Sequence, residues 1–87
     1  MRLDKYLKVS RIIKRRAVAK DLADDNRVFV NDKLSKPSSE VNIGDEVEIR
    51  FEHRHIRVKI TYMSEKMHKD SPPYYELIFD RSVPKSE

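Results

Sequence analysis

Hydrophobic residues recur three or four positions apart in the first part of the chain. Leu3, Tyr6 and Leu7 have this spacing, which places them on one side of a helix and predicts that helix over about residues 3–9. Ser10 follows the stripe, and a serine at this place can cap or turn the chain. The pattern therefore predicts a short helix that ends in a bend.

A second apolar stripe follows the bend, and its members are Val18, Ala19, Leu22 and Ala23. Their spacing predicts a helix over about residues 15–25. We expect this helix to end near Asp25-Asn26, because asparagine tolerates the left-handed conformation that closes helices.

From residue 27 onward the apolar positions alternate, which is typical of strands with one buried face. Val28 and Val30 share a face, and the residues Asn31-Asp32-Lys33 predict a tight turn after them. We expect residues 34–40 to form a loop, because Pro37 cannot donate a hydrogen bond within a central strand.

Two longer alternating runs follow a turn predicted at Gly44-Asp45. The inward residues of the two runs are Val47, Ile49, Phe51, Ile56, Val58, Ile60 and Tyr62. Residues 52–55 between the runs are predicted to form a hairpin loop. Glu46 and Glu48 alternate on the outer face, where solvation explains them.

A polar loop over residues 63–73 precedes the last apolar run, YYELIF, which predicts a final strand. Residues 1–62 then form the main body of one domain, and residues 63–80 complete it. We expect residues 81–87 to be a flexible tail. The predicted class is α+β, with two short helices packed on a small, mostly antiparallel sheet.

Composition limits the possible classes of protein. A chain of 87 residues makes one small domain, and without cysteine it offers no disulfide or thiolate metal site. No apolar run reaches the roughly 18 to 20 residues of a membrane span, and the N-terminal segment lacks the continuous apolar stretch of a signal peptide. We therefore expect a soluble cytoplasmic protein that has no membrane partner.

Positive charge is concentrated at the N-terminal end. Residues 1–20 hold eight basic side chains against Asp4 alone, a net charge of +7 within a chain whose net charge is +4. A polyanion is the usual partner of such a directed charge distribution. A solubilising surface rich in lysine is the alternative.

The predicted second helix gives part of this charge a geometry. At about 100° per residue, Arg16 and Lys20 lie about 40° apart and flank the edge formed by Ala19 and Ala23. Small side chains there would leave a low surface on which a nucleic-acid backbone can approach a guanidinium group. The alternative is that the alanines are small because this helix packs tightly on the sheet.

The start of the same helix is also basic. Lys14 and Arg15 lie at or just before its first turn, where unpaired backbone N–H groups favour an anion. Cations at this end oppose the helix dipole and slightly destabilise the isolated helix. A bound anion would offset that cost.

Residues that commonly carry catalysis or bind metals do not cluster in the sequence. His53, His55 and His68 lack metal-ligand spacing, and Gly44 is the single glycine, so a glycine-rich phosphate loop is absent. We therefore expect neither catalytic residues nor metal ligands, and no cofactor. Tyr6 and Phe29 are the only aromatic residues of the basic half, and both are predicted to be core residues, which favours recognition of a nucleic-acid backbone by its shape over stacking on bases.

The ordered residues resemble the RNA-binding domain first defined in small-subunit ribosomal protein S-four. The resemblance covers residues 2–46 and rests on Arg2-Leu3-Asp4-Lys5, Ser10-Arg11, Lys14-Arg15-Arg16, Ala19, Leu22, Arg27-Val28, Val30-Asn31, Lys36-Pro37-Ser38 and Gly44-Asp45. The chain departs from the family at Asn26 and Asn31-Asp32, where glycine and Asn-Gly are usual. Both replacements tolerate positive φ, so we expect these turns to persist.

In length, the chain resembles the stand-alone members of this family that act in ribosome-associated quality control. A heat-shock relative that binds ribosomes usually carries a longer basic C-terminal extension. Its absence from this sequence favours the quality-control members. A heat-shock type of ribosome recycling is the second expectation.

The resemblance implies a monomeric RNA-binding protein that is not an enzyme. Its expected partners are large-subunit rRNA, the tRNA of an obstructed peptidyl-tRNA, and the factor that adds an alanine tail to the stalled chain. The expected RNA contacts, led by Arg2 and Arg16, are Arg2, Lys8, Ser10, Arg11, Lys14, Arg15, Arg16, Lys20 and Lys36. Asp4 is expected to pair with a nearby arginine, because a carboxylate repels phosphate.

Other functional classes are less well supported. A helix-turn-helix DNA regulator needs polar side chains for base edges, and this helix offers cations and alanines. An RNA-modifying enzyme would need a catalytic domain that this length does not hold. A protein-interaction module built on the last strand and Tyr74-Tyr75 stays open as a second activity.

Overall fold

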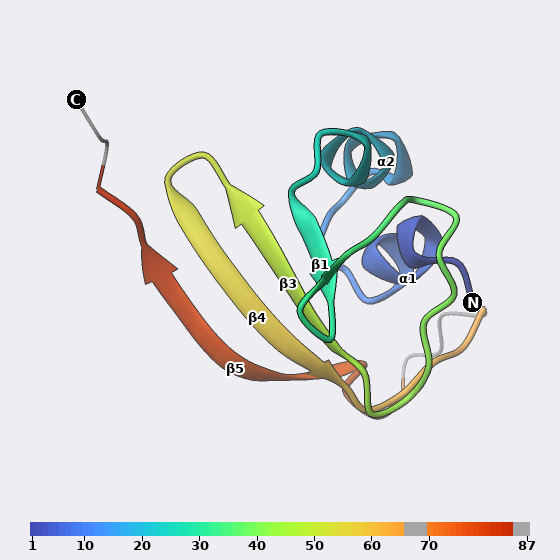
Figure 1. Ribbon diagram of the computed structural model, residues 1–87. Coiled ribbons are helices and arrows are strands. Elements are labelled where there is room, and N and C mark those ends of the chain that lie inside the picture. The colour runs from blue at the N-terminus through green and yellow to red at the C-terminus, as the bar shows by residue number, and fades with distance from the viewer. Residues whose placement is uncertain (66–69, 85–87) are drawn as a thin grey trace.

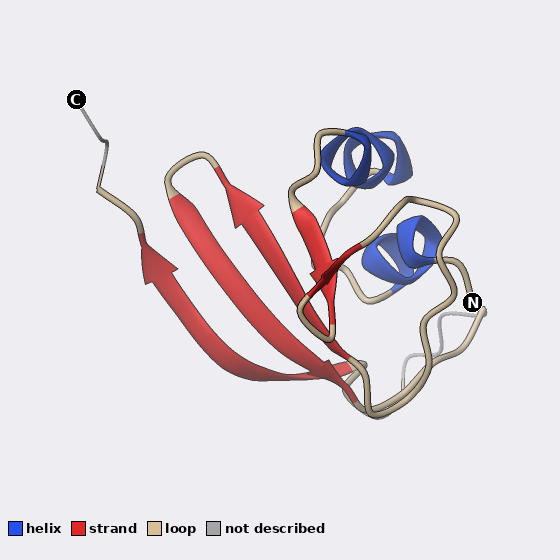
Figure 2. Ribbon diagram, in the orientation of Figure 1, coloured by secondary structure: helices blue, strands red, loops and turns tan. Residues whose placement is uncertain are grey.

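The computed structural model describes residues 1–65 and 70–84 of the chain. Its elements in chain order are α1 (Leu3–Val9), α2 (Arg16–Asp24), β1 (Val28–Val30), β2 (Lys33–Leu34), β3 (Glu46–Phe51), β4 (Arg54–Ile60) and β5 (Tyr75–Ser82). The strands form one sheet in the order β2-β1-β3-β4-β5, and each of these pairings is antiparallel. Both helices lie on one side of the sheet near β1 (Figure 1, Figure 2), which confirms the predicted α+β class.

The two helices end as their sequences predict. The Ser10 hydroxyl, at the end of α1, donates a hydrogen bond to the carbonyl oxygen of Leu7 at 3.1 Å. At the end of α2, Asn26 has φ +61°, and its N–H bonds to the carbonyl oxygen of Ala23 at 3.2 Å. In the part of the chain that the structure describes, neither helix has the length and apolar composition of a membrane span.

The core lies between the helices and the inward face of the sheet. The predicted core residues Leu3, Leu7 and Val28 are buried, whereas Leu22 and Val30 are only half-buried at the edge of the core. The largest fully buried side chains are Tyr6, Leu3, Leu7, Ile49 and Ile60, followed by the valines of the sheet and of the loop before it. The fold therefore depends on α1 as the helix that covers the sheet.

The apolar stripe predicted for α2 is displaced in the structure. Ala19 and Ala23 are buried, but Val18 is 43% exposed. The prediction that Val18 belongs to the buried stripe is wrong. The reason is that α2 packs against α1 and presents its small residues to that neighbour. Larger residues at this contact would separate the two helices.

The first hairpin contains the predicted tight turn and one strand that the sequence did not reveal. Asn31 and Asp32 have φ values of 51° and 68°, as a two-residue turn of the I′ type requires. The turn brings Lys33 and Leu34 back against β1 as β2, although Leu34 was expected in a loop. A two-residue strand is too short to show alternation in the sequence.

The hairpin between β3 and β4 is tighter than predicted. Phe51 pairs with Arg54, so the turn contains only Glu52 and His53, and His55 lies inside β4. The placement of His55 in a loop is therefore wrong. Pairing up to Arg54 satisfies more backbone N–H and C=O groups than a four-residue loop would.

The last strand is longer than the apolar run that predicted it. β5 continues to Ser82, which pairs with Arg54, and the N–H of Val83 bonds to the carbonyl oxygen of His53 at 2.9 Å. Backbone pairing with β4 thus extends the strand through polar residues. Of the expected polar loop and tail, residues 66–69, which include His68, and residues 85–87 lie outside the described residues.

Candidate RNA-binding surface

Asp4 joins two arginines of the basic surface, which consists of the exposed cations Arg2, Lys8, Arg11, Lys14, Arg15, Arg16 and Lys20. The Asp4 carboxylate is 3% exposed, and its Oδ1 lies 3.3 Å from Nε of Arg2 and 3.4 Å from Nη2 of Arg16. The side chains of both arginines are about half exposed. The expected pairing of Asp4 with a nearby arginine is confirmed, and the carboxylate holds two arginines instead of one.

The loop before β3 fixes the start of α1 and therefore the position of Asp4. The N–H of Leu3 bonds to the carbonyl oxygen of Ser39 at 2.8 Å, and the N–H of Asp4 bonds to that of Pro37 at 3.1 Å. These bonds satisfy two of the N–H groups that a helix start leaves free. Arg2, which immediately precedes the helix, is held in an extended conformation beside the loop.

The alanines of α2 serve helix packing and do not form a surface for RNA. Ala19 and Ala23 are buried at the contact with α1, so they do not form a low floor that RNA could approach. The alternative is right that they are small to allow tight packing, but the element on which α2 packs is α1, where the sheet had been expected. Their indirect effect is to bring Arg16 close enough to reach Asp4 on the neighbouring helix.

The start of α2 lies where the sequence predicted it. Arg15 is the residue before the first helical turn, and the exposed Lys14 precedes it. No side chain caps this end of the helix, and its first turn contains no acidic residue within the described chain. The positive end of the helix dipole and several cations therefore share one exposed surface, which favours a phosphate group.

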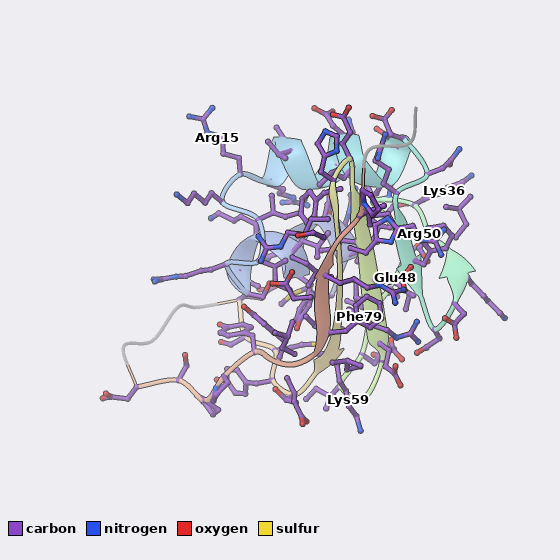
Figure 3. All side chains as sticks on the ribbon, turned by 90° about the vertical axis from the view of Figure 1, so that its left-hand side faces the viewer. Arg15, Lys36, Glu48, Arg50, Lys59 and Phe79 are labelled. Atoms are coloured by element: carbon purple, nitrogen blue, oxygen red, sulfur yellow. The ribbon has the colours of Figure 1, made fainter. Side chains whose placement is uncertain are left out.

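The nine residues expected to bind RNA do not all occupy the same kind of position. Ser10 is 7% exposed, and its hydroxyl is bonded within the end of α1, so we assign it a structural role. The other eight side chains are exposed, and they are Arg2, Lys8, Arg11, Lys14, Arg15, Arg16, Lys20 and Lys36. Figure 3 places Lys36 and Arg15 at opposite edges of the molecule, so Lys36 and Arg15 do not belong to one compact patch.

One feature of this surface was missed in the sequence. Arg11 has φ +65°, a left-handed conformation at the residue after the end of α1. Glycine or asparagine is usual at that position, because a side chain with Cβ is strained there. An arginine in the place of a helix-closing glycine was therefore the available signal that a long cationic side chain stands here despite the strained backbone.

The opposite face of the sheet differs in both charge and packing. Glu48 is 8% exposed, and its carboxylate lies 2.6 Å from Nε of Arg50 and 3.6 Å from Nη1 of Arg57. The guanidinium of Arg50 also lies 4.2 Å from the centre of the Phe29 ring. The expectations of a solvated Glu48 and a core Phe29 are wrong, because Arg50 of β3 covers both side chains and Arg57 of β4 also lies against Glu48. Figure 3 shows Glu48, Arg50 and Lys59 on this face. Arg57 pairs there with Glu46 and Asp32 as well, so acidic groups accompany the basic ones.

Several ionisable groups outside the basic surface are perturbed by their surroundings. Hydrogen bonding to Arg54 lowers the pKa of the Asp80 carboxyl group, and burial raises the pKa of the Tyr6 hydroxyl group. Among residues 1–65 and 70–84, no three histidine, aspartate or glutamate side chains come together as a metal site. The expectation that the protein uses no metal or other cofactor stays a prediction.

Comparisons with known proteins agree with this geometry. Residues 1–47 match the S4 domain family. A protein of Streptococcus pneumoniae named RQC P-site tRNA stabilizing factor is 50% identical over 84 residues, which cover 95% of this chain and 96% of that protein. A protein of the same name from Halalkalibacterium halodurans is 42% identical, with both chains covered completely.

A solved structure shows the same fold. The trimeric structure of Heat Shock Protein 15 from Vibrio cholerae is similar with a TM-score of 0.78 and 28% sequence identity. The similarity covers 88% of this chain and 80% of that one.

Proposed function

The chain belongs to the family of RQC P-site tRNA stabilizing factors and carries an S4 domain, and we propose that it stabilises peptidyl-tRNA on large ribosomal subunits during ribosome-associated quality control. In this role it contacts both large-subunit rRNA and tRNA. The observation that carries the proposal is the pair of exposed guanidinium groups of Arg2 and Arg16, held by the single carboxylate of Asp4.

Orientation of these two arginines suits recognition of a structured RNA backbone. Phosphate contacts fix the position of a protein on RNA, and a guanidinium group can bind two phosphate oxygens at once. Because Asp4 already restrains Arg2 and Arg16, less side-chain freedom is lost when RNA binds. The surrounding cations Lys8, Lys14, Arg15 and Lys20 add attraction that depends on salt.

We further propose that the protein acts as a monomer in the cytoplasm and assists the factor that adds the alanine tail. Its own role in this reaction is to hold the tRNA, without catalysis. The mixed-charge face around Glu48 and Arg50 supports a division of labour, because it differs from the basic surface in charge. RNA would be held on one face while the other stays available to the protein factor.

Co-sedimentation with isolated large subunits tests the proposal. The protein is mixed with subunits that carry an obstructed peptidyl-tRNA and with subunits that are empty, in moderate salt. We expect stronger retention on the loaded subunits and a large loss of retention for the folded double variant Arg2→Ala/Arg16→Ala. Equal retention of the double variant and the unaltered protein would contradict the proposed site.

A heat-shock type of ribosome recycling is the second candidate, and the structural likeness to Heat Shock Protein 15 favours it. The higher sequence identity to the tRNA stabilizing factors supports the first candidate. The two differ in their consequence for the stalled chain. Loss of alanine tails in cells that lack the protein supports quality control, whereas intact tails with delayed subunit recycling support the heat-shock type.

A further inference from the structure

A groove of about 260 Å³ lies between the connection from α1 to α2 and the antiparallel strands β4 and β5. The helices cover the sheet near β1, while β4 and β5 extend beyond them (Figure 1). As a result, part of the inward face of these two strands is left open. The apolar residues that line the groove are Ile12, Phe51, Ile56, Val58, Tyr75 and Leu77.

The exposure of Leu77 shows that the helices leave this end of the sheet uncovered. Leu77 is 53% exposed, although it pairs with Val58, which is completely buried. Pockets for drug-sized ligands usually hold about 300–1,000 Å³. The volume of this groove lies just below that range, so it suits one planar ring better than a helix or an extended peptide.

The polar groups at the rim differ from one side to the other. On one side, the exposed Arg11 belongs to the basic surface and extends from a left-handed backbone position. On the other side, Arg54 of β4 and Asp80 of β5 form a two-point ion pair. The first side attracts a phosphate group.

Asp80 indicates which part of a nucleotide can lie at the far side of the groove. A carboxylate repels phosphate but accepts a hydrogen bond from the exocyclic amino group of a base. The guanidinium of Arg54 offers donors to the acceptor atoms of a base edge. Apolar walls between Arg11 and Asp80 then match the faces of the base, and the aromatic residues Phe51 and Tyr75 are suited to contact with such a ring.

We propose that this groove binds one unstacked nucleobase of the RNA that the basic surface holds. The phosphate of that nucleotide lies at Arg11, and the polar edge of its base faces Arg54 and Asp80. The inference rests on the proposed function in one respect, namely that RNA is the ligand of the adjoining surface. It adds recognition of a base to a surface that otherwise contacts only the backbone.

A titration of the whole protein, followed through its methyl signals by NMR, tests the groove directly. The two probes are an octamer of adenosine ribonucleotides and an abasic octamer with the same number of phosphates. We expect the methyl signals of Ile56, Val58 and Leu77 to shift with the adenosine octamer alone, while the backbone amides of the basic surface shift with both. We also expect about tenfold weaker binding of the abasic octamer, the size of one base-stacking contribution.

The adjacent residues Leu77 and Ile78 provide matched variants. Both are exposed on β5, at 53% and 46%, but only Leu77 lines the groove. Leu77→Glu and Ile78→Glu therefore add the same charge to the same strand. We expect Leu77→Glu to abolish the tenfold preference for the adenosine octamer, and Ile78→Glu to keep it.

Three results would overturn the proposal. The first is an equal preference for the adenosine octamer in Leu77→Glu and Ile78→Glu. The second is a shift of the groove methyl signals when the abasic octamer is added. The third is no response of those signals to either octamer. The last result would point to an apolar protein side chain as the occupant. Failure of the proposed function is recognised separately, because unaltered protein would then show no preference for loaded large subunits while its base-dependent methyl shifts persist.

Discussion

Oδ1 of Asp4 and Nη2 of Arg16 lie 3.4 Å apart, although twelve positions separate the two residues in the sequence. Asp4 lies at the start of α1 and Arg16 at the start of α2. Since the carboxylate is buried and the Arg16 side chain is about half exposed, the pair joins the protein interior to the surface. This contact fixes the direction of a cation that would otherwise sample many rotamers.

The Asp4→Asn variant tests whether RNA binding depends on the orientation of Arg2 and Arg16 or only on the net charge of the protein. The variant gains one positive charge, so charge alone would predict tighter binding to large subunits. Loss of the carboxylate frees both arginines, and we expect binding about tenfold weaker and a loss of about 1–2 kcal/mol in the free energy of unfolding. Filter binding and urea unfolding measure the two effects.

Asp24→Asn is the matched control for that variant. Asp24 is exposed on α2, and its replacement changes the net charge by the same amount. We expect Asp24→Asn to leave binding unchanged or slightly tighter. If both variants tightened binding equally, Asp4 would have no role in orienting the arginines.

Arg16→Ala should weaken binding to large subunits with little change in stability. The side chain is about half exposed, and Arg2 still pairs with Asp4 after its removal, so we expect a stability loss of about 0.5 kcal/mol. Lys59→Ala, on the opposite face in Figure 3, removes the same charge and should leave binding nearly intact. Retention of a folded Arg16→Ala protein equal to that of the control would argue against the site.

Salt should weaken the complex steeply. Six phosphate contacts imply a slope of roughly −4 to −5 in a plot of log binding constant against log salt concentration. Removal of one contacting cation, as in Lys20→Ala, should make the slope less steep by about 0.7 to 0.9. A flat response of the unaltered protein would rule out phosphate contacts as the main source of affinity.

Arg11→Gly should raise stability and lower affinity in the same molecule. Arg11 has φ +65°, where a residue with Cβ is strained and glycine is not. After allowance for the greater freedom of glycine in the unfolded chain, we expect a gain of up to about 1 kcal/mol. Binding to large subunits should fall several-fold, and a variant that becomes less stable would show that the left-handed backbone is not under strain.

Tyr6→Phe should reduce the sensitivity of the fold to high pH. The buried Tyr6 hydroxyl donates to the carbonyl oxygen of Tyr74 at 2.8 Å, and burial raises its pKa above the ordinary value of about 10. The folded state keeps this proton while the unfolded state loses it above about pH 10, so stability falls as the pH rises past that value. Urea unfolding between pH 8 and 11 should show a smaller decline in the variant.

At neutral pH, Tyr6→Phe should lower the free energy of unfolding by about 1 kcal/mol, because one buried hydrogen bond is lost. The cost stays modest because the Tyr74 carbonyl also accepts from the N–H groups of Thr61 and Tyr62. A variant whose stability declines with pH as steeply as that of the unaltered protein would show that Tyr6 is not the responsible group.

The local sequence pattern predicted the structure correctly where nearby residues alone determine the backbone conformation. The spacing of Leu3, Tyr6 and Leu7 predicted α1, and Asn26 predicted the end of α2 by its tolerance of a left-handed conformation. Local pattern failed where a neighbouring element decides the outcome. Glu48 occupies a solvent-facing position in the alternating pattern of β3, yet Arg50 of the same strand and Arg57 of β4 cover it.

By itself, the sequence determined the two helices, the tight turn at Asn31-Asp32, and the excess of positive charge at the N-terminal end. These depend on residues that are close together in the chain, and periodicity and turn preferences record them directly. Only the tertiary structure decided that Asp4 holds Arg2 and Arg16 together, and that β4 and β5 extend past the helices to leave a groove. These features depend on how closely α2 packs on α1 and how much of the sheet the helices cover. Such distances between separate elements follow from packing of the whole chain, and local spacing does not encode them.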